Sequence, residues 1–362
     1  MARDDNPAFA SHRPTLEIAG QRFPLLARNL RSLRMVEGQG GLSSLEACFT
    51  DWIDGPDGVR GFAAHGADNP LKLGSTIMVG AGPADSPQEI FSGVITAIES
   101  RIEPGEPPTI AIMAEDLLFG LRQQRRSKLW EDKSPADICR ALCEDHRLTP
   151  EVRDGLDRPV RNWMQLAQSD LAFLRSVLAS VDADVQMVGD RMQAGPIADQ
   201  ERTALSLAAP GDLVRLRVTA DIAEQHGEAM VSAIDVDGGA MVQTLATSGQ
   251  MGPGEGSTAA QFLDAHFSAG RRQIPGEGPA AQDGTDVRAK AAFSRAARGF
   301  VRAEGTTIGN PELRVGSVAM ISGMNPAFAN RYLVVEAEHR FDMSEGYFTD
   351  FVAHCAFYGD RP

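Results

Sequence analysis

The chain has 362 residues, of which 43% are hydrophobic and 23% charged, so it can bury substantial cores and is too apolar for a disordered tail. Its formal net charge of −14 disfavours a surface built to bind nucleic acid or an anionic membrane, because both are bound mainly through Lys and Arg. No apolar run of about 18 residues occurs, so no membrane-spanning helix is predicted.

In the first part of the chain we expect short strands separated by turns. The stretch TLEIAGQRFPL has Gly20 between two apolar runs, as in a hairpin. A little further on, Leu45, Ala47 and Phe49 alternate with more polar residues, which is the period of a half-buried strand. Three more runs rich in β-branched residues lie at 71–80, 91–100 and 108–116. Closely spaced short strands are typical of a small barrel or sandwich.

Helical periodicity begins near residue 130. Ser134 is the expected N-cap of a helix over 134–148, because Pro135 and Asp137 then occupy first-turn positions that favour proline and acid. A second helix is expected over 169–183, followed by a hairpin that turns at Gly189 and Asp190.

The rest of the chain returns to β character, with strands expected in 212–222 and 229–237. Gly/Pro-rich pieces around a short helical stretch indicate a mobile excursion over 248–285, which we expect to contact a partner. An Ala/Arg-rich helix is expected over 287–299, ending at Gly299. The last three strands are expected in 311–323, 330–341 and 346–357.

Four cysteines are too few and too scattered for a disulfide scaffold: Cys48, Cys139, Cys143 and Cys355. Cys139 and Cys143 lie four residues apart on a predicted helix, but a zinc site would need two further ligands at suitable spacing. We therefore expect buried thiols, and neither a metal nor a cofactor.

One strand-like stretch occurs twice, as PLKLGSTIMVGAG at 70–82 and PELRVGSVAMISG at 311–323. Gly74 matches Gly316, and a second strand follows each copy, where we match Phe91 with Phe328 and Ile95 with Tyr332. Three consecutive matching elements in the same order indicate a duplicated β domain. The predicted division is a tail (1–13), a first β-barrel domain (14–128), an α+β middle domain (129–208) and a second β-barrel domain (209–362).

The stretch 297–351 resembles the last domain of the phage late control D proteins, the central baseplate hubs of contractile tails, which are similar to the N-terminal part of VgrG spikes. The residues that fit the family motifs are Gly309, Pro311, Leu313, Gly316, Phe328, Tyr332, Val334, His339, Gly346, Tyr347 and Thr349. In the first repeat the corresponding positions are Gly74, Phe91 and Gly93. Asn330 replaces a motif glycine, and we expect it to allow the same positive φ. Residues 117–148 and 169–192 resemble the family's middle domain.

The resemblance implies a homotrimer in which six similar barrels form a pseudo-sixfold ring. Such a hub would join the sixfold tail tube to the threefold spike and would line the channel. The implied partners are a spike protein, the tail tube protein, and baseplate wedge and tape-measure proteins. We expect the spike to be a separate chain, because the OB-fold and needle of VgrG are not found here. The implied location is the virion tail baseplate, or that of a tailocin or related injection machine, after assembly in the bacterial cytoplasm. Neither membrane insertion nor specific nucleic-acid binding is expected.

The sequence leaves two other functions open. A tail-associated peptidoglycan hydrolase would need two carboxylates at a fixed separation, but Asp235 with Asp237 and Glu336 with Glu338 are expected on solvated strand faces. His339 and His354 have no Cys or Ser partner at a recognised spacing, so structural roles are expected.

A nucleic-acid-binding β module would use the basic cluster RQQRRSK at 122–128, which we interpret as a solvated face or an intersubunit salt-bridge strip. The sequence DVDGG at 235–239 lacks the further ligands of a calcium loop. We therefore expect a non-enzymatic structural protein.

Overall fold

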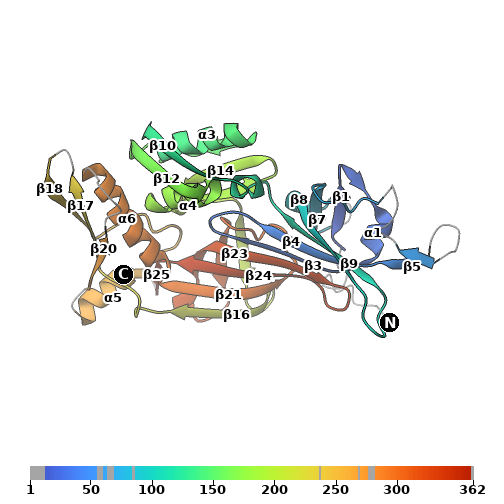
Figure 1. Cartoon of the computed structure of the whole chain (residues 1–362). Helices are drawn as coiled ribbons and strands as arrows, with labels where there is room; N and C mark the ends of the chain where they lie inside the picture. The colour runs from blue at the N-terminus through green and yellow to red at the C-terminus, as the bar shows by residue number, and fades with distance from the viewer. Residues whose placement is uncertain are drawn as a thin grey trace.

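The computed structural model describes residues 13–54, 60–62, 69–83, 86–235, 238–267, 270–275 and 282–359. Figure 1 shows a long sheet body that runs across the molecule, an α+β unit above its middle, and a small helix-and-sheet unit at the left end. The chain is mainly β, with an α+β unit inserted in sequence between two similar five-stranded units, as the sequence predicts. No described helix has the length and apolar character needed to cross a bilayer.

The sheet body contains 13 strands in the order β16-β21-β24-β23-β3-β4-β9-β8-β7-β1-β2, with β22 paired to both β23 and β15. Its strands are β1 (Thr15–Ile18), β2 (Gln21–Arg22), β3 (Leu30–Gly38), β4 (Ser44–Thr50), β7 (Thr76–Ala81), β8 (Gln88–Arg101), β9 (Thr109–Glu115), β15 (Ala204–Ala208), β16 (Leu213–Ala220), β21 (Val301–Ile308), β22 (Val318–Ser322), β23 (Asn330–Asp342) and β24 (Gly346–Cys355). The expected alternation holds, because Leu45, Ala47 and Phe49 on β4 are all buried. Short elements beside the sheet are α1 (Pro24–Arg28), β5 (Trp52–Asp54) and β6 (Arg60–Phe62).

The duplication extends over five strands. Strands β3, β4, β9, β8 and β7 pair in the same order as β16, β21, β24, β23 and β22. Both copies carry two β-bulges at equivalent places. The bulge between Leu30 and Ser32 matches the one between Leu213 and Arg215. The bulge between Ile95 and Ala97 matches the one between Val334 and Glu336. Since a bulge is a local insertion that bends a strand, two shared bulges are strong evidence of equivalence.

The turn before β7 and the turn before β22 are also alike. Gly74 has φ +81° and Gly316 has φ +85°, in the left-handed region that favours glycine. The Gly74 amide donates to the Ile95 carbonyl at 2.8 Å, and the Gly316 amide donates to the Val334 carbonyl at 3.0 Å. Ile95 is therefore equivalent to Val334.

This equivalence corrects the sequence alignment of the second strand. In the first copy, Phe91 lies opposite Val79 on β7. In the second copy, Asn330 lies opposite Ile321, the equivalent of Val79 on β22. Phe91 therefore matches Asn330, two residues beyond Phe328. A shift of two residues keeps every side chain on the same face, so the apolar pattern could not reveal the error.

The two copies form one continuous sheet. Strand β23 of the second copy pairs antiparallel with β3 of the first, from Glu336 opposite Gly38 to Asp342 opposite Ser32. Figure 1 shows the red strands of the C-terminal copy beside the blue strands of the N-terminal copy along this seam.

The inserted α+β unit has its own core and consists of α2 (Phe119–Arg122), β10 (Arg125–Lys133), α3 (Pro135–His146), β11 (Thr149–Val152), β12 (Arg161–Ser169), α4 (Asp170–Ser180), β13 (Ala183–Val188), β14 (Arg191–Pro196) and the 3₁₀ turn η1 (Ile197–Asp199). The predicted start of α3 is confirmed. The Ser134 hydroxyl accepts from the Asp137 amide at 3.1 Å, and the Asp137 carboxylate accepts from the Ser134 amide at 3.1 Å. Strands β13 and β14 form the expected hairpin, with Val188 opposite Arg191.

The expected mobile excursion is wrong for the described part of 248–285. This region contains β19 (Ser257–Thr258), α5 (Ala259–His266), β20 (Arg271–Pro275) and the start of α6 (Gln282–Arg298), which begins five residues before the predicted helix. Strand β20 pairs in parallel with β17 (Glu228–Asp235), which also pairs with β18 (Ala240–Ala246), and β19 pairs with β25 (Phe357–Tyr358). These backbone pairings order a segment whose own apolar content is low.

Candidate assembly interface

The seam between β3 and β23 carries a buried ion pair that joins the two copies. Glu37 on β3 is 2% exposed and Arg314, in the turn before β22, is 6% exposed. The Arg314 guanidinium donates to both Glu37 carboxylate oxygens, at 2.7 and 2.6 Å, and the Val315 amide donates to the same carboxylate at 2.7 Å. Bidentate pairing of this kind fixes the geometry of both groups.

The charges around this pair shift one another's pKa. Burial alone would raise the pKa of Glu37, but the adjacent Arg314 outweighs it and holds the pKa below its usual value. Arg202 lies 3.9 Å from Glu37, and burial together with the charge of Arg314 lowers its pKa to about 10. Glu37 is thus a buried carboxylate that stays ionised because two cations face it.

A neutral hydrogen-bonded set lies further along the same seam. His339 on β23 is fully buried, and its Nδ1 is 2.7 Å from the Tyr347 hydroxyl and 3.3 Å from the Thr349 hydroxyl. The Asn310 amide donates to Thr349 Oγ1 at 3.0 Å, and the Gly309 amide donates to the Tyr347 carbonyl at 2.8 Å. Burial lowers the pKa of His339 to about 3, so the imidazole is neutral at physiological pH.

Four of the family-motif residues therefore meet at one place: Gly309, His339, Tyr347 and Thr349. A Cβ on Gly309 would lie 1.9 Å from the Tyr347 ring, so only glycine fits there. Pro311 lies close by, with its ring 3.3 Å from where a Cβ on Gly82 of the first copy would lie.

The remaining motif residues lie elsewhere along the strands. Phe91 and Gly93 are buried on β8, and a Cβ on Gly93 would lie 2.2 Å from the Glu115 carbonyl oxygen. Tyr332 is fully buried, and its hydroxyl donates at 2.7 Å to the carbonyl of Phe328, in the short 3₁₀ turn η2 (Pro326–Phe328). Gly346 has φ +91° at the turn between β23 and β24.

The expectation for Asn330 is wrong. It has no positive φ and begins β23, where its side chain is buried. Its amide nitrogen donates to the Glu255 carbonyl at 2.7 Å and its oxygen accepts from the Glu255 amide at 3.1 Å. Asn330 thus ties the segment before α5 to the sheet.

The sequence reasoning missed Glu37, Arg202 and Arg314. Glu37 interrupts an otherwise alternating strand with a charge on a buried position, which is a weak signal by itself. Its partner is 277 residues away in sequence, so local periodicity could not pair the two. Arg314 occupies the position of Lys72 in the first copy, which hides it as an ordinary surface cation.

The α+β unit contacts the sheet at the turn that follows β3. The Arg175 guanidinium donates to the Gly41 carbonyl at 2.7 Å, and Gln186 donates to the Gly38 carbonyl at 2.9 Å. A Cβ on Gly41 would lie 2.4 Å from Leu118, so the backbone of the turn lies directly against the unit. The inserted unit therefore holds the end of the seam strand in place.

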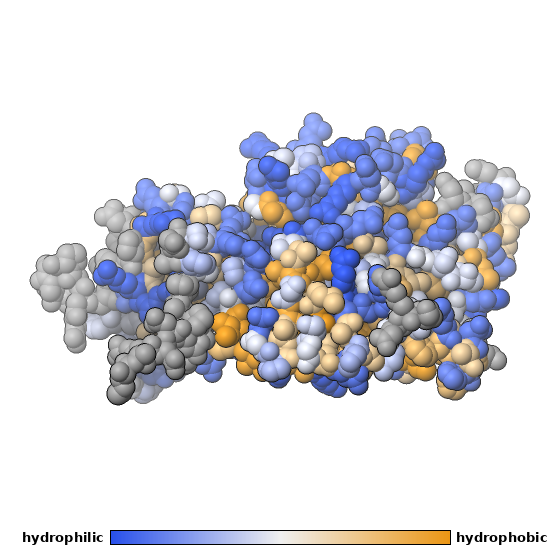
Figure 2. Space-filling model, turned by 180° about the vertical axis from the view of Figure 1, so that it is seen from behind, coloured by the Kyte–Doolittle hydropathy of each residue, from blue (hydrophilic) through white to orange (hydrophobic). Residues whose placement is uncertain are grey.

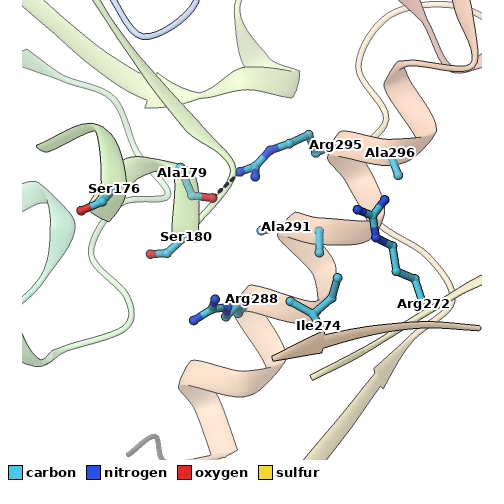
Figure 3. Close-up of a pocket in the computed structure, with 10 residues that line it drawn as sticks. Ser176, Ala179, Ser180, Arg272, Ile274, Arg288, Ala291, Arg295 and Ala296 are labelled. Atoms are coloured by element: carbon cyan, nitrogen blue, oxygen red, sulfur yellow. Dashed lines mark hydrogen bonds between the residues drawn. The ribbon is translucent and has the colours of Figure 1, made fainter. Parts of the chain in front are cut away.

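A cavity of about 350 Å³ lies between α4 and α6 (Figure 3). Ser176 and Ser180 line one side, and Arg272, Arg288 and Arg295 come from β20 and α6. Arg295 donates to the Ala179 carbonyl across the cavity, as the dashed line in Figure 3 shows. The nearby Arg298 side chain donates to the Asp182 carboxylate at 2.7 Å, so α6 is anchored to the middle unit by arginines.

Among the described residues, the acidic pairs of the hydrolase hypothesis and the cysteines considered for a metal site do not come together in one site. Glu336 is exposed, and the Glu338 carboxylate accepts from Arg34 at 2.7 Å; Asp235 is half-buried and Asp237 lies outside the described residues. Cys139 and Cys143 are buried, as expected, and burial raises their pKa to about 12 and about 11. Within the described ranges no three His, Cys, Asp or Glu residues are grouped as a metal site would require.

Two arginines of the basic cluster form ion pairs with carboxylates of their own chain. Arg122 donates to Glu115, and Arg126 donates to Asp145 at 2.8 Å and to Asp170 at 2.7 Å. These ion pairs use two of the arginines that a phosphate-binding surface would need.

The family model described as the Alg8 N-terminal domain matches residues 52–342, which is most of the chain. The chain belongs to this family. The family that matches is therefore not the late control D family, which the sequence motifs resemble. A comparison of this Alg8 N-terminal domain protein with curated proteins finds no match.

Solved structures share the fold of this Alg8 N-terminal domain protein over nearly its whole length. The 43 kDa tail protein of prophage MuSo2 from Shewanella oneidensis has a TM-score of 0.69 at 10% identity, covering 95% of this chain and 98% of that one. A tail protein from Neisseria meningitidis MC58 has a TM-score of 0.68 at 9% identity, covering 95% and 97%. A type VI secretion system component from E. coli has a TM-score of 0.58 at 13% identity, covering 96% and 79%. The fold expected from the resemblance is therefore the one found.

Proposed function

We propose that this protein is a structural hub in the baseplate of a contractile injection machine: a phage tail, a tailocin or a related device. Three copies would form a ring that joins a sixfold tail tube to a threefold central spike and lines the channel. In this proposal residues 14–128 and 209–362 supply the two tube-facing units, and residues 129–208 form the middle unit. The late control D resemblance and the tail-protein fold of the similar structures support it.

The observation that carries the proposal is the five-stranded unit that occurs twice in one chain. Three copies of a chain with two equivalent units present six similar surfaces to one neighbour and a true threefold axis to another. A duplication of this kind solves a symmetry mismatch.

The proposed partners are the tail tube protein and a spike protein, with baseplate wedge and tape-measure proteins as further contacts. We propose no enzymatic role, since the similar solved structures are a tail protein and a type VI secretion component, and Glu338 is paired with Arg34. A peptidoglycan hydrolase would release soluble fragments from purified cell walls, and we expect none.

The solution mass tests the proposal. Light scattering or native mass spectrometry of the purified chain, alone and co-expressed with a spike protein, should give three times 38.8 kDa. Images of that species should show a ring with a central channel. A monomer under both conditions would overturn the proposal and leave the duplication without a symmetry role.

A further inference from the structure

Two strand edges of the repeated five-stranded units are open in the described chain. Strand β16 pairs with β21 on one side, and no described strand pairs with its other side. The end of β8, residues 97–101, extends beyond β7 and is paired only with β9 among the described strands. Open edges present unsatisfied backbone donors and acceptors, and proteins usually cover them.

The duplication shows what would cover these edges. By the matched bulges, β16 is equivalent to β3 with an offset of 183 (Leu30 to Leu213). By the same criterion, β8 is equivalent to β23 with an offset of 239 (Ile95 to Val334). Within the chain the equivalents, β3 and β23, pair with each other along the seam.

We propose that β16 of one copy pairs antiparallel with the end of β8 of a second copy, in the register of the β3–β23 seam. In the seam, His339 of β23 lies opposite Met35 of β3. The offset of 239 makes Ser100 the equivalent of His339, and the offset of 183 makes Val218 the equivalent of Met35. Ser100 would therefore lie opposite Val218 of the next copy. The second copy is the partner because each copy carries one free edge of each kind. This inference rests on the proposed self-association and specifies its contact surface.

Apolar exposure supports this register. Ile102 follows β8 and is 71% exposed, whereas its equivalent in the second copy, Phe341, is buried by β3 and is 4% exposed. Leu216 on β16, which would lie opposite Ile102, is partly exposed, whereas its equivalent Leu33 is buried. The proposed pairing would bury these side chains as the seam buries theirs.

Charge supports it as well. Across the seam Arg34 donates to both carboxylate oxygens of Glu338, at 2.7 Å each. The equivalents are Arg217, which is exposed on β16, and Glu99 on β8, whose carboxylate accepts hydrogen bonds from its strand neighbour Arg101. An exposed pair adds little energy, so its role here is to favour one register over others.

The equivalence has two exceptions. The buried ion pair of the seam is not repeated, because Glu37 corresponds to Ala220 and Arg314 to Lys72. The Met343 amide donates to the Arg31 carbonyl at 3.1 Å at the far end of the seam, and the residue equivalent to Met343 is Pro104, which has no amide hydrogen. The proposed contact is therefore one hydrogen bond shorter than the seam and ends near Ile102.

Because the contact joins different surfaces on the two copies, it repeats from copy to copy until the ring closes. Seam and contact would then alternate around the ring, three of each in a trimer. Figure 2 shows apolar side chains gathered over the sheet body in the lower middle of the molecule, below the mostly hydrophilic α+β unit.

Engineered disulfides test the register. We would make Ser100→Cys with Val218→Cys in the full chain, since directly opposed residues of antiparallel strands have Cα atoms at roughly 4.5–5.5 Å, within the range of a disulfide. The matched control is Ser100→Cys with Thr219→Cys, because residue 219 points to the opposite face. The unmodified chain controls for its four native cysteines.

Under mild oxidation the first variant should give a ladder of covalent dimer and trimer on denaturing gels, reversed by reductant, while the control and the unmodified chain stay monomeric on the gel. If the mass is that of a trimer but the 100/218 pair does not link, or the control links equally well, the register is wrong and the hub proposal stands. If the chain is monomeric at all concentrations and no pair links, both are overturned.

Discussion

At the scale of single residues, the seam combines a buried ion pair with an exposed one. Glu37 and Arg314 are almost fully buried, whereas Arg34 on β3 and Glu338 on β23 are partly exposed to solvent. Removing one partner of a buried pair leaves a charge without compensation, which is far more costly than removing an exposed one.

We therefore expect Arg314→Met to lower the free energy of unfolding by about 3–5 kcal/mol. The matched control, Arg34→Met, should cost less than about 1 kcal/mol, because its pair is solvated. Urea denaturation followed by circular dichroism measures both. Equal losses in the two variants would mean that burial of the pair contributes nothing at this seam.

Burial of two histidines, complete for His339 and partial for His354, makes stability depend on pH. Burial lowers the pKa of His339 to about 3 and of His354 to about 4, while an unfolded histidine titrates near 6.5. Between these values the unfolded chain binds protons that the native chain does not, so stability falls as pH drops below about 6.5. Burial raises the pKa of Asp116 to about 6 and also raises the pKa of Asp184, and both shifts oppose this trend at lower pH.

At pH 5 the contribution of His339 to this loss is about 2 kcal/mol. His339→Gln should therefore show a smaller drop in melting temperature between pH 7 and pH 5 than the unmodified chain. The same substitution at the exposed His266 serves as the control. A drop that is unchanged in His339→Gln would show that this side chain is protonated in the folded protein.

At the scale of elements, local signals predicted the longer helices and many strands, but not β3, one of the two strands of the seam. The alternation in β4 and the cap of α3 are visible in a few consecutive residues. Strands β10 and β12 escaped prediction because few of their residues are buried, and β21 because its polar residues obscure the alternation. The start of α6 escaped because Gly284 and its neighbours look like a loop, although Thr285 is buried against the sheet.

The capping box of α3 allows a prediction at this scale. Ser134→Ala removes the hydroxyl that accepts from the Asp137 amide, so we expect a loss of about 1 kcal/mol. Ser180→Ala is the control, because that hydroxyl only donates to the Val177 carbonyl within α4 and should contribute little. Thermal melts of the two variants should separate, and coinciding curves would show that the cap does not limit stability.

At the scale of the whole molecule, the net charge of −14 and the internal pairing of the basic cluster act in the same direction. Both disfavour DNA binding, since affinity requires cations that are free to neutralise phosphates. A channel lining that does not hold DNA would let it pass.

We expect no measurable binding of labelled duplex DNA at about 150 mM salt, by fluorescence anisotropy. Replacing Arg122, Arg125 and Arg126 by Ala should leave that result unchanged. Clear binding by the unmodified chain that the triple substitution abolishes would favour the nucleic-acid-binding alternative instead.

The sequence by itself determined the β-rich character, the inserted helices and the repeated glycine turn, because each depends on residues close together in the chain. Only the tertiary structure decided that β3 pairs with β23, that Glu37 meets Arg314, and that the alignment of the second strand shifts by two residues. The physical reason is that strands pair through backbone hydrogen bonds, which are the same for every sequence. A strand's partner is therefore chosen by packing and by buried charges contributed from distant parts of the chain.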